Sequence, residues 1–88
     1  MISTEQVNAI VSKIEALGVD ETTVSALRQQ YQPIHFTYCM DDDLPNNTPI
    51  IEHKDFNIYL IDGREHCLCL TSDYDVATGI VIAEIIAE

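Results

Sequence analysis

The stretch Phe56–Leu70 constrains the fold of this chain most, because it has the pattern of two strands that fold back on each other. Residues 62–63 are Asp-Gly, and this pair between alternating apolar residues is the strongest short-range signal for a β-hairpin. A two-residue turn would pair Ile61 with Arg64, whereas a three-residue loop would pair Ile61 with Glu65. We expect the second register, because burial normally decides register and this one collects large apolar side chains on one face.

In the expected register the two faces of the hairpin differ in polarity. The apolar face carries Phe56, Ile58, Leu60, His66, Leu68 and Leu70. The opposite face carries Asn57, Tyr59, Ile61, Glu65, Cys67 and Cys69. We therefore expect the rest of the chain to pack against the apolar face of this hairpin.

Apolar residues at helical spacing predict two helices near the start of the chain. The first helix, Ser3–Leu17, begins with the capping-box pair Ser3 and Gln6. Its apolar stripe is Val7, Ile10, Val11, Ile14 and Leu17. A second helix, Glu21–Tyr31, follows a short link that contains a glycine and ends at Asp20, a good N-cap residue. Because the link is short, the two helices are expected to form a helical hairpin.

The hydrophobic period changes after the second helix. Ile34–Met40 alternates between apolar and mixed residues and predicts a strand. The segment Asp41–Asp55 contains prolines, asparagines and three consecutive aspartates, and predicts a long loop. Consecutive β-branched residues favour a strand over Ile80–Ile86, and the alternative is one helix over Asp73–Ala87 with Gly79 inside it.

The order of these elements predicts an α+β fold. We expect one domain over residues 1–88, in which the N-terminal helical hairpin packs on a three- to four-stranded antiparallel sheet. A chain of 88 residues is long enough for one domain and too short for two.

The charge balance excludes some classes of partner. Fifteen acidic residues face four basic ones, which gives a net charge of −11. Nucleic-acid backbones and anionic membranes are bound by Lys and Arg, so we expect neither as a partner. An acidic chain suits a basic protein partner or a cation, although such a charge can also serve solubility alone.

The N-terminal residues do not have the pattern of a secretory signal, and no apolar run approaches the length of a membrane span. These observations predict a soluble, cytoplasmic protein. Three cysteines are an odd number, and a disulfide framework is not expected in this compartment.

The segments HFTYCMDDDLP, FNIYLIDGREHCLCLTSD and ATGIVIAE resemble those of a family of small uncharacterised bacterial proteins that carry a domain of unknown function. The resemblance covers most of the chain. It implies no known activity, ligand or site residue.

The thiols and imidazoles are the first candidates for a site. Cys67 and Cys69 would share one face of a strand, and Cys39 and His35 share a face of another. If these strands paired in a suitable register, the four side chains could form a tetrahedral zinc site. The alternative is that the cysteines are small buried hydrophobic residues, which is the more common role of such thiols. His53, in the long loop, is expected to be exposed.

The second candidate is a surface for association. Asp41, Asp42 and Asp43 lack the spacing of a calcium loop, and are expected to be solvated or to bind a basic partner. Tyr59 and Ile61 lie on the hairpin face away from the apolar one, and could bind a partner or a second copy, unless the long loop covers them. We therefore predict a non-enzymatic, acidic accessory module that binds a protein partner or forms a homodimer, without a cofactor.

Overall fold

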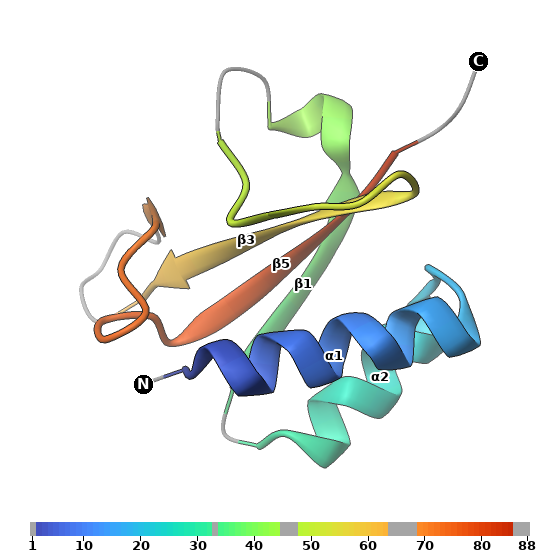
Figure 1. Ribbon diagram of the computed structural model, residues 1–88, viewed down its shortest axis with the longest axis horizontal. Helices are drawn as coiled ribbons and strands as arrows, with labels where there is room; N and C mark the ends of the chain where they lie inside the picture. Colours follow the sequence, from blue (N-terminus) through green and yellow to red (C-terminus); the bar gives the residue numbers. More distant parts are fainter. Residues whose placement is uncertain (1, 33, 45–47, 64–68, 86–88) are drawn as a thin grey trace.

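The computed structural model describes residues 2–32, 34–44, 48–63 and 69–85. It has two helices followed by a sheet of five strands, with both helices on one face of the sheet (Figure 1). The elements are α1 (Thr4–Leu17), α2 (Glu21–Gln30), β1 (His35–Met40), the short 3-10 helix η1 (Asp41–Asp43), β2 (Ile51–Glu52), β3 (Phe56–Asp62), β4 (Cys69–Thr71) and β5 (Gly79–Glu84). This confirms the predicted α+β class and the N-terminal pair of helices.

The two helices begin at the predicted caps. The Ser3 hydroxyl accepts a hydrogen bond from the Gln6 amide at 3.1 Å, and the Gln6 side chain accepts one from the Ser3 amide at 2.9 Å. The Asp20 carboxylate accepts from the Thr23 amide at 2.8 Å and caps α2. Gly18 ends α1 with a φ of 96°, which residues with a Cβ rarely adopt. These caps satisfy amides that a helix leaves without partners at its first turn.

The strand order is β1-β5-β3, and β2 and β4 both pair with the far edge of β3. β1 runs parallel to β5, while β3 runs antiparallel to it, so the sheet is mixed and the expectation of a purely antiparallel sheet was wrong in this detail. The strand predicted near the end of the chain is confirmed as β5, and the alternative of one long helix is wrong. β5 is central and its residues from Gly79 to Ala83 are buried, which explains its uninterrupted apolar sequence.

The predicted hairpin exists, but its register differs from both expectations. Ile61 pairs with Leu70, and Asp62 pairs with Cys69, whereas the two predicted registers paired Ile61 with Arg64 or with Glu65. Leu70 therefore lies on the face opposite to Leu60 and is 36% exposed. The prediction failed because β5, and not β4, completes the apolar face of β3. Arg64 to Leu68, which the prediction placed in the turn and the second strand of the hairpin, lie outside the described part of the chain.

The core lies between the helices and the sheet. Its buried members are Ile2, Val7, Ile10, Ile14, Val24, Leu27, Phe36, Phe56, Ile58, Leu60, Ala77, Ile80 and Ile82. The opposite face of the sheet carries a smaller buried cluster of Tyr59, Ile61, Val81 and Ala83, against which Cys39 and Leu44 pack. Within the described ranges, no helix is both long and apolar enough to cross a membrane.

Candidate functional site

Asp41, directly after β1, is hydrogen-bonded to the smaller buried cluster through Tyr59. Its Oδ1 accepts hydrogen bonds from the Asn57 side-chain Nδ2 at 2.8 Å and from the Tyr59 hydroxyl at 3.2 Å. The single turn of η1 directs this carboxylate over the sheet, while Asp42 and Asp43 are exposed. Of the three consecutive aspartates, one is therefore structural and two face solvent.

Carboxylates also gather on the helix face of the same strand end. The Tyr38 hydroxyl donates a hydrogen bond to Glu84 at the end of β5. This bond, burial of the ring, and the negative charges of Glu84, Glu21 and Asp20 raise the pKa of Tyr38 to about 12. The carboxyl end of β1 thus lies among acids from η1, β5 and the start of α2. We call this set the acidic end, and its members are Asp20, Glu21, Asp41, Asp42, Asp43 and Glu84.

β1 is an edge strand, since it pairs with β5 on one side and the described residues include no strand on the other. The His35 amide donates to the Thr78 carbonyl at 3.2 Å, which shows that His35 directs its backbone groups toward β5. Because backbone groups alternate in direction along a strand, those of Phe36, Tyr38 and Met40 point away from β5. We call this row the outer edge of β1.

Arg28 covers the first part of the outer edge. Its Nε donates to the Phe36 carbonyl at 3.2 Å, and its Nη1 lies 3.8 Å from a Glu21 carboxylate oxygen. Beyond Phe36, the backbone groups of Tyr38 and Met40 continue the edge into the acidic end. An unpaired edge of this kind can accept an added strand.

The structure does not bring together the three predicted metal ligands that it describes, Cys39, Cys69 and His35. Cys39 lies on β1 and Cys69 on β4, at opposite edges of the sheet and on opposite faces. Three strand spacings separate them, which is about 14 Å. His35 shares the face of Cys39 but lies four residues away, about 13 Å along the strand. Cys67 lies outside the described residues.

The surroundings of Cys39 favour the protonated form of its thiol. Burial, together with the charges of Asp43 and Asp41, raises the pKa of the Cys39 thiol. A thiol that holds its proton is a poor nucleophile, because the thiolate is the reactive form. Among the residues that the structure describes, no three His, Cys, Asp or Glu side chains are placed to hold an ion.

Tyr59 and Ile61 lie on the sheet face away from the helices, and are 3% and 6% exposed. The pKa of Tyr59 is raised by burial and by Asp41, so its phenol keeps its proton for the bond to that carboxylate. Both residues were candidates for a partner surface, but their side chains are buried in the smaller cluster of the sheet.

His53 is less exposed than expected. Its ring stacks on Phe56 with centroids 4.3 Å apart, and its Nε2 lies 3.1 Å from a Glu15 oxygen of α1. Its Nδ1 accepts from the Asp55 amide at 3.2 Å. The ring therefore connects the turn before β3 to α1. His53 was predicted to be exposed, but its side chain packs against Phe56.

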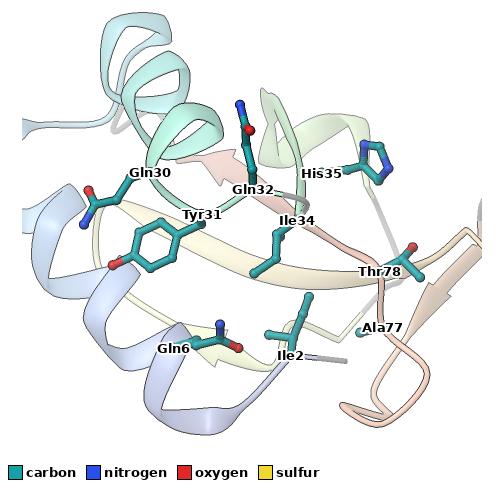
Figure 2. Close-up of a pocket in the computed structure, with 9 residues that line it drawn as sticks. All are labelled: Ile2, Gln6, Gln30, Tyr31, Gln32, Ile34, His35, Ala77 and Thr78. Carbon is teal, nitrogen blue, oxygen red and sulfur yellow. The ribbon is translucent and has the colours of Figure 1, made fainter.

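A hollow of about 460 Å³ lies at the other end of β1, where α1 begins and α2 ends (Figure 2). Ile2, Gln6, Gln30, Tyr31, Gln32, Ile34, His35, Ala77 and Thr78 line it. The side-chain oxygens of Gln6 and Gln30 accept from the Ser3 amide and the Lys13 ammonium, so each amide group has a fixed orientation. Among the described lining residues there is no carboxylate, thiol or amine, and the groups that can form hydrogen bonds include the Tyr31 and Thr78 hydroxyls and the His35 imidazole.

The sequence interpretation did not single out this hollow. The signal that was present is the concentration of glutamines before Pro33, at 29, 30 and 32, where the apolar stripe of the second helix ends. Glutamine is common on exposed helix surfaces, so the pattern alone does not distinguish a pocket lining from a solvated helix end.

Comparison with known proteins finds a match to one family model, which covers residues 9–85 and is described as a family of unknown function, DUF6129. No curated protein matches the chain. No solved structure matches it. The expected resemblance to a domain of unknown function is confirmed.

Proposed function

Because the chain belongs to DUF6129, a family of unknown function, we propose a function from the geometry of the acidic end: the protein is a non-enzymatic interaction module that binds a basic segment of a protein partner in the cytoplasm. The observation that carries the proposal is the convergence of carboxylates from α2, η1 and β5 around the carboxyl end of an edge strand. Lys and Arg side chains are the groups that such a surface attracts.

A basic protein segment suits this surface better than a metal ion does. One oxygen of Asp41 already accepts from Asn57 and Tyr59, and no three acidic, His or Cys side chains of the described residues are placed to hold an ion. It also suits the surface better than a second copy, since two chains of net charge −11 repel each other. The partner class is therefore a positively charged polypeptide.

The test is titration of the protein with a fluorescein-labelled, capped octapeptide of alternating lysine and threonine, followed by fluorescence anisotropy at low and moderate salt. We expect binding that weakens as salt rises, because exposed charge pairs are screened. The first variant combines Glu21→Gln, Asp42→Asn and Asp43→Asn. We expect it to bind about tenfold more weakly, since each exposed pair contributes up to about 1 kcal/mol.

The matched control combines Glu5→Gln, Asp73→Asn and Asp75→Asn. It removes the same number of charges: one from the first turn of a helix, as in the first variant, and two from exposed positions between β4 and β5 in place of the two from η1. These residues lie at the other end of the molecule, where the Ile2 amide donates to the Tyr74 carbonyl. Equal weakening by the two triple variants, or no binding by the native protein, would contradict the proposal.

A further inference from the structure

We infer that the basic segment binds by strand addition, as an extended chain hydrogen-bonded to the outer edge of β1. This inference rests on the proposed function and specifies how the same site recognises its partner. In this mode, backbone hydrogen bonds hold the segment and its side chains provide the selectivity.

The geometry of the outer edge supplies the backbone groups. The His35 bond to Thr78 sets the alternation, so the amides and carbonyls of Tyr38 and Met40 point outward. Arg28 holds the Phe36 carbonyl and marks the near limit of the open stretch. From Tyr38 to Met40 the open edge spans about 7 Å, which is enough for the central residues of a short added strand.

The charges on both faces of the sheet define the side chains of the added strand. On the helix face its residues would lie beside Tyr38, near Glu84 and Glu21. On the other face they would lie beside Cys39, near Asp41 and Asp43. Lysine or arginine side chains of the added strand are therefore favoured on either face of the sheet. A basic residue at every second position of the segment places all of these side chains on one face.

A second copy of the chain fits this description poorly. Its own edge strand, HFTYCM, contains neither Lys nor Arg, and runs directly into three aspartates. Pairing of two β1 strands would bring the acidic end of each copy to the same new sheet. The occupant is therefore a basic segment from another protein.

Met40 provides the test on the protein. Its φ of −87° and ψ of 145° lie close to those of proline, and its amide points outward, so Met40→Pro removes one outer-edge donor without removing a bond to β5. Met40→Ala removes the same side chain and keeps the donor. We expect Met40→Ala to bind the lysine–threonine octapeptide as the native protein does, and Met40→Pro to bind it at least about fivefold more weakly, from the loss of one hydrogen bond.

Two peptides test the same mode on the native protein. Both are the capped lysine–threonine octapeptide with three N-methyl groups, placed on alternate residues in one peptide and on three consecutive central residues in the other. Alternate methylation leaves one edge of the peptide able to pair, whereas consecutive methylation blocks both edges at equal charge. We expect only the alternately methylated peptide to keep the affinity of the parent.

These outcomes separate the mode from the function. Salt-dependent binding that is equal for both methylated peptides overturns strand addition and leaves the proposed function standing. Absence of salt-dependent binding of the parent peptide overturns both. If sedimentation shows the native protein to be a dimer that Met40→Pro converts to a monomer, the outer edge is occupied by a second copy, and the inference is wrong. If Met40→Pro does not fold, the peptide pair decides alone.

Discussion

Asp41 shows how one residue of a charged run acquires a role that its neighbours lack. All three aspartates follow β1, but only Asp41 accepts hydrogen bonds from two side chains of β3. One of those donors, the Tyr59 hydroxyl, belongs to a side chain that is 3% exposed. A buried hydroxyl that loses its partner pays the full cost of desolvation.

The substitution Asp41→Ala is therefore expected to lower the free energy of unfolding by about 1–2 kcal/mol. Asp42→Ala removes the same charge from an exposed side chain, and is expected to change it by no more than about 0.5 kcal/mol. Urea denaturation followed by circular dichroism measures both. Equal effects of the two variants would mean that charge, and not the bonds to Asn57 and Tyr59, determines the contribution of Asp41.

Tyr38 gives the protein a defined response to alkaline pH. An unfolded tyrosine releases its proton near pH 10.0, whereas the folded protein raises the pKa of Tyr38 to about 12. The contribution of Tyr38 to stability is thus fully present below pH 10 and is lost as pH rises through 12. Tyr38→Phe has no such proton, and its unfolding free energy is expected to fall less steeply across that range. Parallel curves for the two proteins in urea titrations from pH 9 to 12 would contradict this assignment.

At the scale of elements, the parallel pairing of β1 and β5 depends on a close approach at their amino ends. A Cβ placed on Gly79 would lie 2.9 Å from the His35 carbonyl oxygen and 3.1 Å from the His35 Cβ. The first of these is a contact with backbone, which cannot move without disturbing the pair. The absence of a side chain at Gly79 is therefore a packing requirement of the parallel pair.

We expect Gly79→Ala to lower the free energy of unfolding by about 1–3 kcal/mol, because it overpacks this contact. Gly18→Ala provides the contrast, since a Cβ there meets nothing within 4 Å and the strain comes from its φ of 96°. Amide hydrogen exchange distinguishes the two: faster exchange confined to β1 and β5 is expected for Gly79→Ala alone. If Gly79→Ala has the same free energy of unfolding and the same amide exchange rates as the native protein, β1 and β5 accommodate the added Cβ and the contact is not a packing requirement.

At the scale of the whole molecule, β1 joins two ends of different character. Its carboxyl end lies among the acids of η1, α2 and β5, while its amino end borders the hollow where α1 begins and α2 ends (Figure 2). The helices cover one face of the sheet only (Figure 1). Under the proposed function, a basic partner binds at the acidic end and not at the hollow.

How much of this arrangement could be predicted depends on the distance in sequence between the residues concerned. The caps at Ser3 and Asp20 and the strand predicted over Ile34–Met40, which is β1 (His35–Met40), are confirmed, because each depends on neighbours within a few residues. The pairing of His35 with Gly79 joins distant segments, and no local pattern specifies it. The hairpin register failed for the same reason, since the true partner of β3 on its apolar face is β5.

The candidate site follows the same division. Its acidic character was visible in the sequence, but the separate role of Asp41 depends on how one turn of η1 directs a carboxylate toward β3. The gathering of Glu21 and Glu84 around Tyr38 depends on the packing of α2 and β5 beside β1. The separation of Cys39 from Cys69 depends on strand order, which the composition of the strands does not reveal.

The central position of β5 has a consequence for biosynthesis. β1 and β3 do not pair with each other, and β5 lies between them and pairs with both. β5 is translated after the other four strands. While a ribosome is still adding residues before Gly79, the emerging chain can form its helical hairpin and the short pairings of β3 with β2 and β4, but it lacks the strand that joins β1 to them. Until β5 leaves the exit tunnel, the pairing edges of β1 and β3 stay open on the nascent chain, where a chaperone can bind them.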